Sequence, residues 1–341
     1  MDNIMNQMGG GMGNGMFGGG NPFAGGMPNF GGMGNGLFGN PAAPAPATNP
    51  APAPTPSQPK KGHEALTIKV LPVNTKQSTL YSSSSSVSKI FLKLKQLIVA
   101  ADSSFLSEEN IRILRELEKC LTNRVENPNF LLPSGCFRLI EKLRDLLPAT
   151  EVFPVMDILR LLVLHPIAAE YFGNIGNDFM DSLIKDFILC ENPPSGPAQW
   201  LSARVVCNLC GDEKAGKNMV HETRIDNLME IVMSGFESSV KQMRHTAATI
   251  SFNASLRCAG NSEVIMQLLS AVCHNLTSKE LPDDVVFTLL MTLGRLVYKN
   301  QESVELADAL GVNMESFMSS SSEKIKQAAK EVQLLLTTPA Q

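Results

Sequence analysis

The stretch WLSARVVCNLC, residues 200–210, shows two superimposed patterns. Its apolar side consists of Leu201, Val205, Val206 and Leu209. These spacings are typical of the buried face of an α-helix. Trp200, Arg204 and Asn208 recur every fourth residue, so they form a line along one face of the same helix. The stretch therefore predicts a helix with an aliphatic body and one line of polar and aromatic side chains.

The same stretch contains a C-x-x-C pair, Cys207 and Cys210. A zinc site needs about four ligands, and no second C-x-x-C or H-x-x-H accompanies the pair. A thioredoxin-type site would lie at a strand-to-helix junction. We therefore interpret both cysteines as small core residues and expect neither a metal nor a cofactor. The seven cysteines are scattered and no secretory signal precedes them, which predicts reduced thiols in the cytosol or the nucleus.

Helical periodicity extends from about Leu66 to Leu336. We expect helices over 86–101, 107–121, 136–147, 153–166, 178–190, 197–210, 222–234, 238–258, 261–276, 282–299, 301–310 and 322–337. Groups of helices recur about every 40 residues, the period of armadillo and HEAT arrays. The pattern predicts an all-α, armadillo-like solenoid of about six repeats, with a concave groove as the ligand surface.

Several residues mark where these helices begin and end. Ser107 precedes two glutamates and is a predicted N-cap. Pro154 suits a first helical turn, and Pro166 is expected to stop the same helix. Gly311 directly follows ELADAL, where a left-handed glycine would end a helix.

Residues 1–62 differ in composition from the remainder. Gly, Met, Asn and Phe dominate the beginning, and a Pro/Ala-rich stretch follows. Such composition cannot bury enough apolar surface to offset the ordering of the backbone. We therefore expect a disordered tail over 1–62 and one folded domain over 63–341.

Bulk composition excludes several function classes. The formal net charge is −4, and no Lys/Arg run exceeds PKK, so nucleic-acid binding is not expected. No apolar run approaches the roughly 20 residues that span a bilayer. The five histidines are spread along the chain and do not form a convergent set with a nucleophile and a carboxylate, which argues against an enzyme.

The polar line of residues 200–208 recurs in other helices. His245, Thr249, Asn253 and Arg257 run in fours, Thr288, Thr292 and Arg295 form a similar line, and Arg160 is the lone basic residue in its helix. An asparagine amide can both donate to and accept from the backbone of an extended peptide. Arginine can bind carboxylates bidentately, and Trp200 offers an apolar or cation–π wall. The alternative is that Asn208 and Asn253 bond the backbone between repeats while the arginines are solvated.

Four blocks carry a resemblance to a known family: EVFPVMDILRLLVLHPIAAEYF, NPPSGPAQWLSARVVCNLCGDEKAGKNMV, TAATISFNAS and TLLMTLGRLVYKNQESVELADALGV. In this order they resemble the PUL domain, the C-terminal armadillo-like domain of phospholipase-activating proteins. The resemblance implies a non-catalytic adaptor for ubiquitin-dependent degradation. Its basic groove would bind the acidic C-terminal tail of the valosin-containing AAA ATPase.

Residue by residue, the resemblance implies a groove built from Arg160, Arg204, Asn208, Lys241 and Asn253. Together with the polar lines, it gives the predicted groove set: Arg160, Trp200, Arg204, Asn208, Lys241, His245, Asn253 and Arg295.

Two departures from the family pattern leave questions open. Thr288 stands where relatives carry arginine, and Arg295 lies two turns further on. The WD-repeat and ubiquitin-binding domains that precede the PUL domain in phospholipase-activating proteins have no counterpart in this sequence. A scaffold for a different extended acidic peptide is the alternative function.

Overall fold

The computed structural model describes residues 61–83, 86–127, 130–194, 196–278 and 280–340. Within these ranges every regular element is helical, which confirms the all-α prediction. The first elements are η1 (Gly62–Ala65), α2 (Val87–Asp102), η2 (Ser103–Phe105), α3 (Glu108–Thr122), α4 (Cys136–Leu146), α5 (Phe153–Leu162), α6 (Pro166–Gly173), α7 (Asp178–Phe187) and α8 (Pro197–Gly211). The remainder are α9 (Glu213–Met219), α10 (Ile225–Glu237), α11 (Lys241–Ser255), α12 (Ser262–Ser278), α13 (Asp283–Val297), α14 (Gln301–Ala309), α15 (Met314–Met318) and α16 (Glu323–Thr337).

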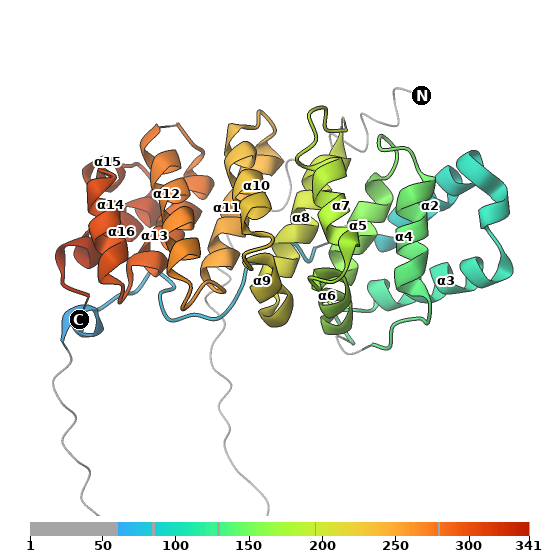
Figure 1. The fold of residues 1–341 in the computed structure, drawn as a ribbon, viewed down its shortest axis with the longest axis horizontal. Coiled ribbons are helices and arrows are strands. Elements are labelled where there is room, and N and C mark those ends of the chain that lie inside the picture. The colour runs from blue at the N-terminus through green and yellow to red at the C-terminus, as the bar shows by residue number, and fades with distance from the viewer. Residues whose placement is uncertain (1–60, 84–85, 128–129, 195, 279, 341) are drawn as a thin grey trace, which may run out of the picture. The chain divides into compact units, whose positions relative to one another are not determined.

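Six of these helices form a continuous inner row, in which each packs against the next: α2, α5, α8, α11, α13 and α16. The other helices pack beside this row, so each inner helix belongs to one layer of a stack (Figure 1). The helical unit is thus a solenoid of six layers, as the repeat spacing predicts.

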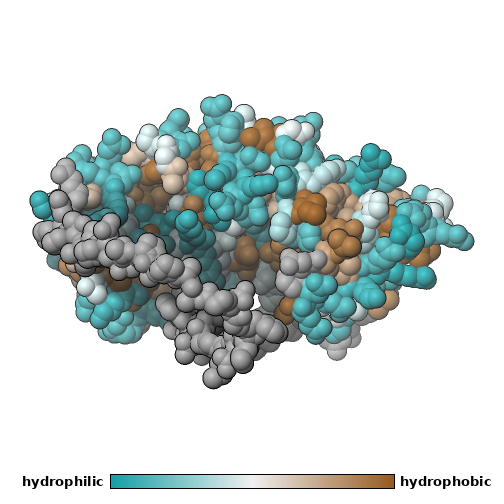
Figure 2. All heavy atoms as spheres, turned by 90° about the horizontal axis from the view of Figure 1, so that it is seen from below, coloured by the Kyte–Doolittle hydropathy of each residue, from teal (hydrophilic) through white to brown (hydrophobic). Residues whose placement is uncertain are grey.

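Apolar side chains hold the layers together. Inner helices such as α8 and α11 are buried on most of their faces, because each lies between two neighbouring layers. Outer helices such as α3 and α4 bury one stripe only. The face drawn in Figure 2 is mainly hydrophilic, with separate apolar patches. No described helix is both long and apolar enough to cross a bilayer.

The helix predicted over 153–166 ends earlier than expected, and a second helix follows directly. The helix α5 ends at Leu162, and Pro166 occupies the first turn of α6. Between them, His165 adopts an extended backbone, and its Nδ1 accepts from the N–H of Ile167 as an N-cap. Proline therefore begins a helix here, because its fixed φ and missing N–H suit a first turn. The short helices α9 and α15 are also absent from the sequence prediction.

Two of the predicted helix ends are confirmed. The Ser107 hydroxyl accepts from the N–H of Asn110 at the start of α3. Gly311 has φ of +68° directly after the C-cap of α14, a backbone conformation that favours glycine.

Residues 66–83 are not helical, which corrects the expectation of helical texture from Leu66 onward. We call this segment the strap. It has no regular secondary structure of its own, and it contains Pro72 and several β-branched residues. The strap runs from the C-terminal layers back toward α2 (Figure 1, blue). The predicted disordered tail falls almost entirely on residues 1–60, which lie outside the described residues.

Candidate peptide-binding groove

The strap binds the inner row of helices through one polar side chain from each of five helices. These side chains are Glu331 of α16, Arg295 of α13, Asn253 of α11, Asn208 of α8 and Arg160 of α5. All five bond the backbone of the strap. The concave face therefore holds an extended peptide, and that peptide belongs to the same chain.

The strap is fixed first at the C-terminal layer. The carboxylate of Glu331 accepts from the N–H groups of Lys69, Val70 and Leu71 at 2.8–3.0 Å. Upstream, buried His63 contacts the carbonyls of Leu335 and Thr338 through Nε2, at 2.8 Å each. Charge-assisted bonds of this kind are stronger than neutral ones, so the segment is anchored where it meets α16.

Arg295 makes the next contact. Its Nη1 donates to the carbonyls of Val73 and Thr75 at 3.0 and 2.9 Å, and its Nε donates to the carbonyl of Ser255 at 3.2 Å. The guanidinium is therefore engaged with the strap and with the end of α11. Thr288, half-buried on the same helix, donates to the carbonyl of Asp284.

The two asparagines make paired bonds with alternate strap residues. Asn253 accepts from the N–H of Thr79 at 2.9 Å and donates to its carbonyl at 2.8 Å. Asn208 accepts from the N–H of Tyr81 at 2.8 Å and donates to its carbonyl at 3.3 Å. Each amide thus satisfies both backbone groups of one residue without contacting its side chain.

The same amides also connect neighbouring layers. Asn253 of α11 donates to the carbonyl of Cys207 on α8 at 3.0 Å, and Asn208 donates to that of Arg160 on α5 at 2.9 Å. The sequence leaves two interpretations of these asparagines: bonds to the backbone of a bound peptide, or bonds to the backbone between repeats. In the structure each asparagine bonds both the strap and the neighbouring layer.

Arg160 is buried, with 4% of its surface exposed. Its Nη1 donates to the carbonyls of Tyr81 and Ser83 at 2.5 and 3.2 Å. Its Nε and Nη2 bond Asp157 at 2.8 and 2.5 Å. All three guanidinium nitrogens have partners within the chain, so this arginine serves the strap in this structure.

Two glycines let the strap approach the helices closely. A Cβ at Gly294 of α13 would lie 2.6 Å from a methyl of Leu71, and one at Gly211 of α8 would lie 2.4 Å from a methyl of Leu80. Both distances are shorter than real contacts, so a side chain at either position would displace the strap.

A second set of polar residues lies nearer the N-terminal ends of α8 and α11. We call it the open row: Trp200, Arg204, Lys241 and His245. The Arg204 guanidinium carbon lies 4.4 Å from the ring centroids of both Trp200 and Tyr81. The Arg204 Nε is buried and has no hydrogen-bond partner. The residue as a whole is only half-buried, so the other N–H groups of this ring-bound cation can approach an anionic acceptor.

The open row is positively charged although the chain is net acidic. Burial lowers the pKa of Arg204, and the nearby charge of Arg160 lowers it further. Burial also lowers the pKa of His245, as do the charges of Lys241, Arg204 and Arg244. Asp284 opposes this effect through an ion pair with His245 at 3.1 Å. Lys241, Arg204 and Arg244 each disfavour the charged form of His245, and an anion placed among these cations would relieve their repulsion.

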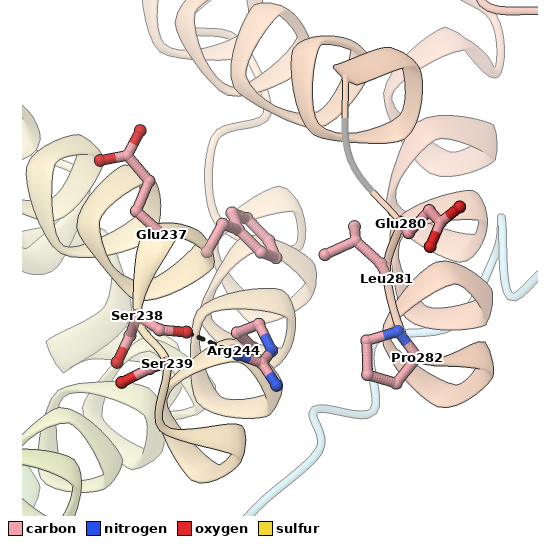
Figure 3. Close-up of a pocket in the computed structure, with 8 residues that line it drawn as sticks. Glu237, Ser238, Ser239, Arg244, Glu280, Leu281 and Pro282 are labelled. Atoms are coloured by element: carbon pink, nitrogen blue, oxygen red, sulfur yellow. Dashed lines mark hydrogen bonds between the residues drawn. The ribbon is translucent and has the colours of Figure 1, made fainter.

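An open pocket of about 790 Å³ lies beside the N-terminal end of α11 (Figure 3). Phe236, Leu281 and Pro282 supply its apolar part, and Arg244 faces it while donating to the carbonyl of Ser238 at 2.6 Å. Glu237 and Glu280 also line the pocket. Its mixed charge distinguishes it from the basic open row.

The C-x-x-C pair is part of the core, as predicted. Cys207 and Cys210 are fully buried within α8. Burial raises the pKa of Cys207 well above its usual range and that of Cys210 to about 12. Both thiols stay protonated at neutral pH and fill space. In the described part of the chain, no group of three or more His, Cys, Asp or Glu residues could hold a metal.

Comparison with known proteins identifies the family. The PUL domain model matches residues 74–333. The chain belongs to the PUL domain family. PUL domains are protein-interaction modules, so the family and the fold agree on a binding role. The match includes strap residues 74–83, the inner helices α2 to α13 and α16 as far as residue 333.

One relative is the phospholipase A-2-activating protein of Xenopus laevis, 28% identical over 238 residues. The alignment covers 66% of this chain and 28% of the relative, so the chain spans little more than a quarter of that protein. Two crystal structures of engineered proteins align with TM-scores of 0.40 and identities of 15% and 17%. They cover 72% and 73% of this chain, and 98% and 96% of their own. This likeness adds no argument about the fold.

Sequence reasoning missed the strap-binding role of Glu331 and the contribution of Tyr81 to the open row. Glu331 lies in the ordinary amphipathic pattern of α16, which gives no sign that its carboxylate is buried. The sequence does hold one signal of the strap, because Gly294 lies inside α13 and Gly211 ends α8, where strap side chains approach closely.

Proposed function

We propose that this chain is a non-catalytic adaptor whose open row binds the acidic C-terminal tail of the valosin-containing AAA ATPase. The carrying observation is Arg204, a half-buried cation held against the rings of Trp200 and Tyr81. Membership of the PUL family supports a protein partner. The positive charges around Arg204 support an acidic partner.

In this proposal the partner lies beside the strap and does not replace it. A carboxylate of the tail accepts from Arg204, and Lys241 and His245 add attraction along α11. Tyr81 forms one wall of the site, because its ring covers Arg204 and its hydroxyl bonds that of Thr249 at 3.3 Å. The strap thus completes the binding surface.

In this proposal, four of the eight predicted groove residues bond the strap and do not contact the partner. Arg160, Asn208, Asn253 and Arg295 position the strap, and Trp200, Arg204, Lys241 and His245 remain for the partner. The first four therefore contribute to partner binding through Tyr81 and the path of the strap.

The test is isothermal titration of the full chain with a synthetic peptide of the ATPase tail, at low and at high salt. We expect binding at low salt that weakens several-fold when the salt concentration rises from about 50 to 200 mM, because exposed charges are screened. A peptide with every Asp and Glu replaced by Asn and Gln is the matched control and should not bind.

A different extended acidic peptide is the second candidate, and two observations favour it. The resemblance to PUL domains implies an arginine at the position of Thr288, which this chain lacks, and Asp284 places a negative charge beside His245. Binding of an unrelated acidic peptide as tightly as the ATPase tail would support this candidate. Failure of both acidic peptides to bind at low salt would contradict the account of the open row.

A further inference from the structure

The last residues of the strap lie among arginine side chains. Arg160 donates to the carbonyls of Tyr81 and Ser83, and Arg124 donates to the carbonyl of Ser82. The Arg204 guanidinium lies against the Tyr81 ring. The side chains of Ser82 and Ser83 are exposed, so their hydroxyls are accessible while their carbonyls are held.

The arginines around Ser82 and Ser83 outnumber the carboxylates that pair with them. Arg160 is paired with Asp157. Arg124 donates only to carbonyls, those of Leu121 and Ser82, and forms no ion pair within the described residues. Burial lowers the pKa of Arg124, and the charge of Arg160 lowers it further. Neutral carbonyls therefore occupy positions where guanidinium groups favour an anion.

We propose that Ser82 and Ser83 form a phosphorylation site, whose phosphate is bound by Arg124 and reduces the affinity of the open row for acidic peptides. The regulatory half of this proposal rests on the proposed function. The phosphate-binding half rests on the arginines around the strap alone.

The modification is phosphoryl transfer from ATP by a serine kinase. The serine Oγ forms a bond to the γ-phosphorus, and the bond between that phosphorus and the β–γ bridging oxygen breaks. ADP leaves with the electron pair, and the hydroxyl proton passes to a base of the kinase. An extended segment with accessible hydroxyls presents the acceptor without unfolding the helices.

A phosphoserine carries about −1.5 to −2 charges and can form one to three charge-assisted hydrogen bonds with arginine. Bound to Arg124, it attaches the strap more firmly. It also offsets the positive charge that Arg204 presents to an acidic partner. The modified chain should therefore be more stable and bind the acidic peptide more weakly.

The experiment uses the full chain with phosphoserine encoded at position 82, and separately at 83, compared with the unmodified chain. Phosphoserine at Ser321, an exposed residue of the C-terminal serine run, is the matched control for binding. Each form is also made with Arg124→Gln, which removes the charge, and with Arg124→Lys, which retains it. Melting temperature and affinity for the acidic peptide are measured at low and at high salt.

We expect phosphoserine at 82 or 83 to raise the melting temperature by about 2–4 °C, a gain that Arg124→Gln and high salt remove and Arg124→Lys largely keeps. We expect the affinity for the acidic peptide to fall about fivefold to tenfold, with no such fall for phosphoserine at 321. An unchanged melting temperature at both positions would overturn the phosphate site. A raised melting temperature with unchanged peptide affinity would overturn the regulatory half.

If the unmodified chain binds no acidic peptide, the proposed function fails while the melting temperatures still decide the phosphate site. Phosphopeptide mapping of the chain isolated from its own cells tests use of the site. Phosphate on Ser82 or Ser83 is expected, and complete coverage of the strap with phosphate only elsewhere would overturn the proposal.

Discussion

The two halves of the concave face are built from the same helices and yet bind differently. Toward the C-terminal ends of α8 and α11, Asn208 and Asn253 are buried and bonded to the strap. Toward the N-terminal ends, Arg204 and His245 are only partly buried, and Arg204 keeps an unsatisfied donor. A polar line on an inner helix thus contains residues that complete the fold and residues that remain for a partner.

The largest expected effect tests the strap half. Asn253→Ala removes the bonds to Thr79 and Cys207 and leaves their backbone groups poorly satisfied. We expect the free energy of unfolding to fall by about 3 kcal/mol, measured by urea denaturation. Gln242→Ala, at an exposed amide of the same helix, is the control and should change it by less than about 0.5 kcal/mol. Equal losses in the two variants would contradict the role of Asn253.

The next effect tests the open row. Arg204→Ala should weaken binding of the acidic peptide about tenfold to a hundredfold, because a central arginine between two rings has the character of a binding hot spot. Titration calorimetry measures this. Arg112→Ala is the control, since Arg112 pairs with Glu109 and Glu116 on the exposed face of α3. A similar loss of affinity in both variants would indicate non-specific charge attraction.

A smaller effect tests the close approach of strap and helix. Gly294→Ala should lower the free energy of unfolding by about 1–2 kcal/mol, because the new methyl overlaps the side chain of Leu71. In a Leu71→Ala background the overlap is absent, and alanine should then be neutral or stabilising within α13. Additive losses in the double variant would contradict the contact.

The smallest effect concerns pH. Burial lowers the pKa of His245 in the folded chain, so the unfolded chain binds this proton more tightly. The free energy of unfolding should therefore fall as the pH drops through about 6.5. A bound acidic peptide favours the protonated ring, so binding takes up a proton. The affinity should rise about two- to fivefold between pH 7.5 and 6.0. In His245→Asn this rise should disappear, and its persistence would assign the effect to another group.

The sequence predicts much of the architecture, because local signals determine it. Periodicity locates the inner helices, and Gly311 marks a helix end that the structure confirms. The helix α5 ends before Pro166, as expected, but the same proline also begins α6, because proline is compatible both with the end of one helix and with the first turn of the next.

The candidate site is predictable only in part, for a physical reason. The pattern predicts that Asn208 and Asn253 bond the backbone of an extended partner peptide, and in the structure they bond the backbone of the chain's own strap. The pattern does not predict that residues 66–83 bind there. Because the asparagines bond backbone groups, the side chains of residues 66–83 carry no sequence pattern that matches them. Contacts between residues more than 100 positions apart, such as Tyr81 with Asn208, depend on the stacking of the layers.

The most direct test of the account is amide hydrogen exchange of the strap in the full chain, free and bound to the acidic peptide. The account predicts that the amides of Leu71, Thr79 and Tyr81 exchange slowly in both states, since Glu331 and the two asparagines hold them. Rapid exchange at these three positions in the free chain, or its onset when peptide is added, would contradict a groove filled by its own chain.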